Sequence, residues 1–222
     1  PVGAAKETAD PAAVQAGTYA VDNTHATVLA QVSHFGFSTN TVRFDTINGT
    51  VTYDPAKPEA SKTDITIDTT TLNSGFGKRD EHLKSAAFFN VAAFPTAAFK
   101  ADKLVKTGAD TADLPGQLTL LGVTKPLKLT ATHFNCGPNP FTKKEMCGAD
   151  LVGTLKRTDF GMKYGVPAIS DEVKLTIAVE GYRDCVAPAR AARCKSARLR
   201  ATRRCSPYPT ACTRAGARPG SR

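Results

Sequence analysis

Tryptophan is absent from this sequence of 222 residues, and methionine occurs only twice. A binding groove lined by many adaptable methionine side chains is therefore excluded. No apolar run approaches the roughly 20 residues that a helix needs to span a bilayer, so we do not expect an integral helical membrane protein. The sequence begins at Pro1 without a basic start or an apolar signal region, and we expect a signal peptide to be either absent or already removed.

Acidic residues are missing from the last part of the chain. Residues 187–222 contain ten Lys and Arg and no Asp or Glu, whereas residues 1–186 carry nineteen basic and twenty acidic residues. The formal net charge of +9 therefore belongs to the tail. A nucleic-acid or anionic-membrane binder acting through this tail is one hypothesis, and it predicts a steep salt dependence that is lost when residues 187–222 are deleted. For the rest of the chain we expect no specific nucleic-acid partner.

The motifs of common enzyme classes are missing as well. The sequence has no GxSxG, no Walker loop, no GxGxxG before a helix and no HExxH, so we expect neither an enzyme nor a metal site. A rival hypothesis is a small hydrolase or isomerase that uses Asp22/His25 or Asp80/His82 and shows a bell-shaped pH–rate profile. The simpler interpretation is a hydrogen bond near a strand end for the first pair, and a helix cap at Asp80 with Arg79 as its ion-pair partner.

Strict alternation of apolar and polar residues begins at Tyr19. A period of two with one apolar face is typical of β-strands that have one side in water. Turn signals occur at Asn48-Gly49, Asp54-Pro55, Pro115-Gly116 and Gly122–Pro126. About eight such strands indicate an all-β fold, an antiparallel barrel or sandwich.

Three segments depart from this alternation. Residues 1–16 are Ala-rich and lack periodicity, and we expect a disordered leader. Residues 79–95 suit a short helix, with Asp80 as its cap and Leu83, Ala86 and Ala87 on one face. Residues 187–222 have few large apolar side chains, and we expect a basic disordered tail.

Six cysteines fall into two groups. Cys136 and Cys147 flank a Gly- and Pro-containing loop between two expected strands, where adjacent antiparallel strands would bring them within disulfide distance. A zinc site is the alternative, but no CxxC pair and no His at ligand spacing accompanies them. A disulfide indicates an oxidising compartment. The other four, Cys185, Cys194, Cys205 and Cys212, have no evident partners.

Five motifs in order resemble those of the YceI-like family. The resemblance covers about residues 17–184, and the most specific stretch runs from Lys78 to Phe99, similar to the family's RDxHLxSxxFFxxxxxP pattern. The other four are Tyr19-x-Val21-Asp22-x-x-His25 with His34-x-Gly36-x-Ser38, Leu118–Pro126, Asp159–Met162 and Ile169–Val173.

This resemblance implies an antiparallel, eight-stranded, lipocalin-like β-barrel over residues 17–186, with one short helix after the RDxHL loop. It implies a periplasmic or secreted protein that binds an isoprenoid chain, such as an isoprenoid quinone or a polyprenyl phosphate, with no catalysis and with a link to stress responses in some members. No other cofactor is expected, and a homodimer is compatible with the sequence.

The alternation and the family match together predict which side chains point inward, although composition alone does not distinguish a ligand cavity from a filled core. The expected polar contacts to a ligand head group are His34 and Arg43. The expected interior residues are Val28, Ala30, Val32, His34, Phe44, Ile65, Ile67, Phe89, Phe99, Leu118, Leu120, Leu127, Leu129, Val173, Leu175 and Ile177.

Overall fold

The computed structural model describes residues 14–184 of the chain. Most of the expected leader, the whole basic tail over residues 187–222, and the cysteines Cys185, Cys194, Cys205 and Cys212 lie outside the described residues.

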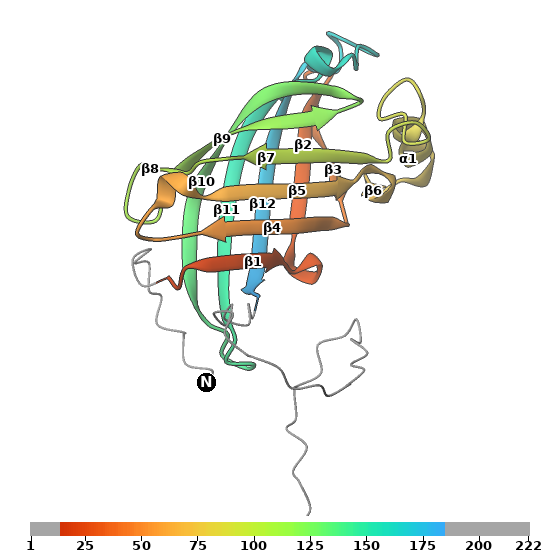
Figure 1. Ribbon diagram of the computed structural model, residues 1–222. Coiled ribbons are helices and arrows are strands. Elements are labelled where there is room, and N and C mark those ends of the chain that lie inside the picture. Colours follow the sequence, from red (N-terminus) through yellow and green to blue (C-terminus); the bar gives the residue numbers. More distant parts are fainter. Residues whose placement is uncertain (1–13, 185–222) are drawn as a thin grey trace, which may run out of the picture. The chain divides into compact units, whose positions relative to one another are not determined.

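Eight strands close into an antiparallel barrel within the described residues, which confirms the predicted fold (Figure 1). The hydrogen-bonded order is β1-β4-β5-β7-β9-β10-β11-β12, and β1 pairs with β12 to complete the ring. Their bounds are β1 Gly17–Val21, β4 Ile47–Tyr53, β5 Lys62–Asp68, β7 Thr96–Ala101, β9 Ala112–Leu120, β10 Val123–Pro138, β11 Glu145–Lys156 and β12 Glu172–Arg183.

Further strands extend the barrel at one end. β2 (Thr27–His34) pairs with β12 beyond the segment that pairs with β1, and β3 (Ser38–Phe44) pairs with β2. A 3-10 turn, η2 (Asn23–His25), separates β1 from β2, so these two strands are the halves of one bent strand alongside β12. The remaining short elements are β6 Leu72–Asn73, β8 Val105–Lys106, η3 Pro58–Ala60, η4 Thr69–Thr71 and η5 Arg157–Phe160.

Two of the expected turns are in fact strand interiors. Asn48-Gly49 lies within β4, where the backbone of β5 passes so close that a Cβ on Gly49 would lie 2.1 Å from the carbonyl oxygen of Asp64. Pro115-Gly116 lies within β9. By contrast, the predicted turn at Gly122 joins β9 to β10, and both Leu121 and Gly122 have the positive φ angles that such a tight hairpin needs.

The helix α1 (Gly77–Lys84) contains the RDxHL motif and does not follow it. The expected cap is wrong, because Phe76 occupies the N-cap position and Asp80 lies in the first turn. Asp80 accepts hydrogen bonds from the amide and the hydroxyl of Ser74, and Arg79 donates to the hydroxyl and the carbonyl of the same serine. Both charged side chains therefore fix the turn that precedes the helix.

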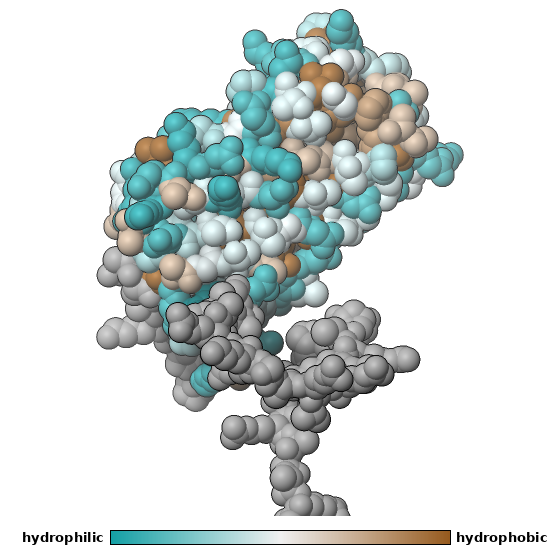
Figure 2. Space-filling model, viewed as in Figure 1, coloured by the Kyte–Doolittle hydropathy of each residue, from teal (hydrophilic) through white to brown (hydrophobic). Residues whose placement is uncertain are grey.

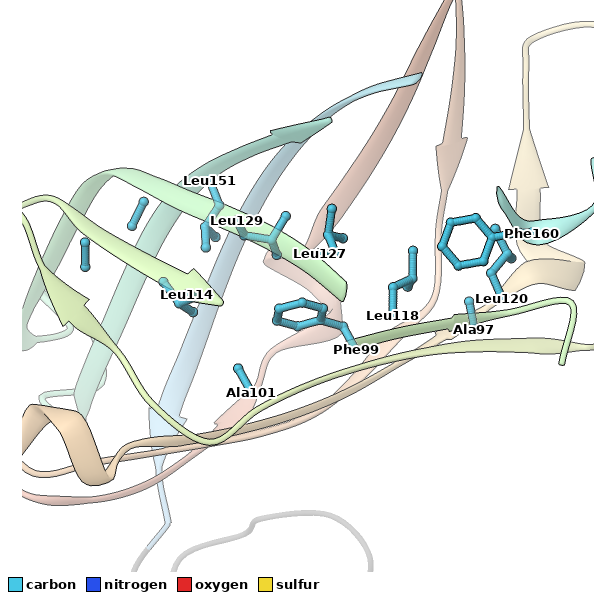
Figure 3. Close-up of a cluster of buried hydrophobic side chains, with 12 residues drawn as sticks. Ala97, Phe99, Ala101, Leu114, Leu118, Leu120, Leu127, Leu129, Leu151 and Phe160 are labelled. Carbon is cyan, nitrogen blue, oxygen red and sulfur yellow. The ribbon is translucent and has the colours of Figure 1, made fainter. Parts of the chain in front are cut away.

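The barrel interior holds the main hydrophobic cluster, to which β7, β9, β10 and β11 contribute (Figure 3). A smaller cluster at one end includes Val14, which is buried with Tyr19, Tyr53 and Cys136. Packing therefore begins three residues before the expected start of the barrel. The outer face in Figure 2 is mostly hydrophilic, with hydrophobic residues gathered at the end where α1 lies.

Candidate ligand-binding cavity

A cavity with an almost wholly apolar surface lies inside the barrel, and each of the eight ring strands contributes to its lining. Its volume is about 180 Å³, counted as the space that the centre of a water molecule can reach. This corresponds to on the order of a dozen water-sized spheres. The interior therefore contains a cavity and is not a completely filled core. The sequence alone did not distinguish these two alternatives.

A second apolar cavity, of about 100 Å³, adjoins the first at the end of the barrel near α1. Its lining includes Phe89, which follows α1, and Arg157 and Met162 from the segment around η5. Phe44 and Phe89 meet edge to face within this lining, with ring centroids 5.5 Å apart. The two cavities share five lining residues and are therefore neighbours along the barrel interior: Val28, Ile67, Phe99, Leu129 and Ile177.

Fourteen of the seventeen residues expected to contact a ligand line one or both cavities. They are Val28, Ala30, Phe44, Ile65, Ile67, Phe89, Phe99, Leu118, Leu120, Leu127, Leu129, Val173, Leu175 and Ile177.

Val32, His34 and Arg43 do not belong to either lining. Val32 and His34 are half-buried on the part of β2 beyond the cavities, where the His34 ring packs edge to face on Phe35. Arg43 is exposed and forms an ion pair with Asp45, at 2.7 Å between Nε and Oδ1. It points away from the interior because it alternates with the inward-facing Phe44, so neither expected head-group contact lies at the cavities.

The sequence reasoning missed several residues that line the larger cavity. Tyr19 and Val21 of β1 and Leu114 of β9 are inward-facing. The alternation of Leu114, Leu118 and Leu120 indicates the strand β9. Pro115-Gly116 within it is typical of a turn, so the sequence reasoning did not extend the strand to Leu114.

Neither pair of the hydrolase hypothesis faces a cavity as an acid–base couple. His25 is exposed, and its Nδ1 lies 2.9 Å from Oδ2 of Asp22, which also caps η2 by accepting from the Thr24 amide. Asp80 binds Ser74, whereas the ring of His82 packs against Phe88 and Tyr164. Within residues 14–184, no three His, Cys, Asp or Glu side chains gather as a metal site would require.

The buried Arg157 closes the cavity end near α1. Its guanidinium donates to four backbone carbonyls, those of Met162, Tyr164, Ile169 and Ser170, at 2.8 to 3.2 Å. Asp171 adds a second link, because its carboxylate accepts from the amide and the hydroxyl of Thr158. These bonds hold together the two last motifs of the sequence, around Asp159–Met162 and Ile169–Val173.

The disulfide between Cys136 and Cys147 closes the hairpin of β10 and β11, in which these two residues are direct partners in register. This confirms the predicted pairing. None of the helices among the described residues has the length and apolar character to cross a membrane.

A closed antiparallel barrel around apolar cavities defines a lipocalin-like class of small-ligand-binding barrels. The chain belongs to the YceI-like family, because the model of the YceI-like domain matches residues 19–181. A "UPF0312 protein" of Azotobacter vinelandii is 39% identical over 170 residues, which is 76% of this chain and 88% of that protein.

Solved structures agree with this assignment. The YCEI protein of Campylobacter jejuni superposes with a TM-score of 0.62 at 29% identity, and covers 68% of this chain and 90% of its own. A polyisoprenoid binding domain from Saccharophagus degradans superposes with a TM-score of 0.58 at 17% identity, and covers 77% of this chain and all of its own, which shows a shared fold.

Proposed function

We propose that this protein binds an isoprenoid chain, as part of an isoprenoid quinone or a polyprenyl phosphate, inside its barrel and carries it without catalysing a reaction on it. The observation that carries this proposal is the pair of adjoining apolar cavities along the barrel interior. Burial of an apolar chain there is favourable by about 25 cal/mol per Å² of apolar surface removed from water. The polyisoprenoid-binding domain of Saccharophagus degradans, which shares the fold, supports the ligand class.

The first test is organic extraction of the purified protein followed by mass spectrometry. We expect an isoprenoid lipid in the extract, or a rise in melting temperature when an isoprenoid quinone is added to the delipidated protein. An extract without lipid, together with an unchanged melting temperature, would contradict the carrier function.

The variant Leu129→Arg tests whether the cavity is the binding site. Leu129 is buried and lines both cavities. An Arg side chain at this position would occupy the space that the isoprenoid chain needs, and its burial without a partner would cost several kcal/mol. We expect a folded protein that no longer retains lipid. Val152→Arg is the matched control, because Val152 is exposed on β11 and its substitution should leave lipid binding unchanged. Retention of lipid by folded Leu129→Arg would place the ligand elsewhere.

We also propose a periplasmic or secreted location, which the Cys136–Cys147 disulfide supports because such bonds persist in oxidising compartments. Peptide mapping of protein isolated without reductant tests this location. Free, alkylated Cys136 and Cys147 would contradict it. Assembly as a homodimer stays a prediction, which light scattering on the purified protein checks.

A further inference from the structure

Phe99 and Leu129 stand at the boundary between the two cavities. Both residues line both cavities, whereas Leu114 and Leu151 line only the larger one and Leu118 and Leu120 only the smaller. Figure 3 shows the same order along the interior, with Phe99 from β7 and Leu129 from β10 between these two groups of leucines. An isoprenoid chain too long for one cavity must therefore pass these two side chains, which bound the passage together with Val28, Ile67 and Ile177.

The side chain of Leu129 lies over a glycine of β11, Gly153. Ala149, Leu151 and Leu155 pack into the interior, and Gly153 occupies the inward position between the two leucines. Gly153 is also the direct partner of Leu129 across the β10–β11 pairing. A Cβ on Gly153 would lie 2.6 Å from Cδ2 of Leu129, which is closer than such atoms approach in proteins. The missing side chain is therefore what lets Leu129 lie against the wall.

The ring of Phe99 likewise lies over a glycine of β9, Gly116. In β9 the inward residues are Leu114, Gly116, Leu118 and Leu120. A Cβ on Gly116 would lie 2.5 Å from Cζ and 2.7 Å from Cε2 of the Phe99 ring. The ring therefore covers the backbone of β9 at a position where its inward neighbours carry leucine side chains.

We propose that Gly116 and Gly153 are specificity-determining residues, which set the width of the passage between the two cavities and thereby the length of the chain that binds. They act by letting Phe99 and Leu129 lie flat against the stretch of wall that the neighbouring strands β9, β10 and β11 form, so that one long isoprenoid chain occupies both cavities. This inference rests on the proposed binding of an isoprenoid chain and adds the residues that select its length.

Gly153→Ala is the decisive variant, because its added methyl meets only the flexible end of Leu129 at close range, whereas a methyl on Gly116 would also lie 2.5 Å from the carbonyl oxygen of Lys100. The new methyl displaces Leu129 from the wall into the passage. We expect the affinity for the long isoprenoid alcohol solanesol to fall at least about tenfold, and the affinity for the short alcohol geraniol to stay within about twofold. Displacement of a fluorescent apolar dye measures both affinities, with no tryptophan emission in the background.

Two further variants separate the passage from general effects on the barrel. Val152→Ile adds a methyl to an exposed side chain on the outward face of the same strand, next to Gly153, and should change neither affinity. The double variant Gly153→Ala/Leu129→Ala removes the leucine side chain that the new methyl displaces. It should therefore recover solanesol binding.

Each outcome distinguishes the inference from the function on which it rests. If the wild-type protein binds neither alcohol, the proposed carrier function fails. If it binds both, and folded Gly153→Ala binds both equally well, the inference on length selection is overturned and the carrier function stands. If Gly153→Ala does not fold, Ile177→Phe narrows the same boundary from β12, and loss of both alcohols to the same extent would overturn the inference.

Discussion

His25 and Asp22 form an exposed hydrogen-bonded pair whose role is local. The carboxylate of Asp22 accepts from the amide and the hydroxyl of Thr24 and faces Nδ1 of His25, so it fixes the turn between β1 and β2. Burial raises the pKa of Asp22, but the hydrogen bonds from His25 and Thr24 outweigh it, and the pKa lies below its usual value. The sequence suggested either catalysis or a hydrogen bond near a strand end, and the geometry favours the hydrogen bond.

The first prediction concerns the protonation of His25. The hydrogen bond to Asp22, and secondarily the charge of Glu180, raise the pKa of His25 above its usual value of 6.5. Because folding raises this pKa, the protonated pair stabilises the fold fully below pH 6.5, and the contribution is lost as the pH rises through the folded-state value. We expect an NMR titration of the imidazole to show the raised pKa.

Two substitutions check the cause of this shift. Asp22→Asn should bring the His25 pKa back toward 6.5, and Glu180→Gln should lower it by less, since the hydrogen bond is the larger cause. An imidazole that titrates identically in the wild-type protein and in Asp22→Asn would show that the pair does not exist in solution.

At the scale of elements, the segment from η5 to the start of β12 depends on one side chain. Arg157 is 3% exposed, and the four carbonyls that it binds all belong to this segment. The planar guanidinium satisfies them at once, which a single ammonium group on a lysine cannot do. Arg157 therefore serves here as the packing centre of a loop. Its burial lowers the pKa of the guanidinium below the usual value.

We predict that Arg157→Lys lowers the free energy of unfolding by about 3 kcal/mol, because it leaves buried carbonyls without donors. Urea denaturation measures the change. Arg43→Lys is the matched control, since Arg43 is exposed and its ion pair with Asp45 is worth at most about 1 kcal/mol. Equal effects of the two substitutions would contradict the role of Arg157 as a packing centre.

The elements also mark the limit of what the sequence predicts. Alternation located β2, β4, β5, β7, β10, β11 and β12 well, because one face of each is apolar and the other meets water. The turn signals were wrong at Gly49 and Gly116, because Asn-Gly and Pro-Gly are typical of turns, whereas these glycines here allow close approaches to β5 and to Phe99. Such approaches depend on strands distant in sequence, so the local pattern carries no trace of them.

The sequence likewise predicted one part of the candidate site and not another. Fourteen expected residues line the cavities because alternation and the family match together indicate which side chains point inward. The placement of Phe99 and Leu129 could not be predicted, because each side chain lies over a glycine of a neighbouring strand that is distant in sequence. Likewise, His34 shares the inward face of β2 but lies beyond the cavities, since alternation gives the direction of a side chain and not its position along the barrel.

At the scale of the whole molecule, closure of the ring and the disulfide act on the same end of the barrel. β1 pairs with both β4 and β12, and Val14, Tyr19 and Tyr53 pack there with Cys136. The disulfide joins two strands that are already paired in register, so the ring of hydrogen bonds does not depend on it.

The last prediction follows from this arrangement. Replacing both Cys136 and Cys147 with Ala should lower the free energy of unfolding by about 3 kcal/mol, the value for the chain entropy of a loop of 11 residues. The barrel should still form, because its register and its inward leucines are untouched. Solanesol should still bind, because Cys147→Ala keeps a small apolar side chain in the lining of the larger cavity and leaves Phe99 and Leu129 unchanged. Urea denaturation measures the first expectation and dye displacement the second. A folded variant that loses solanesol binding would show that the disulfide shapes the cavity, whereas an unfolded one would make it a requirement for the barrel.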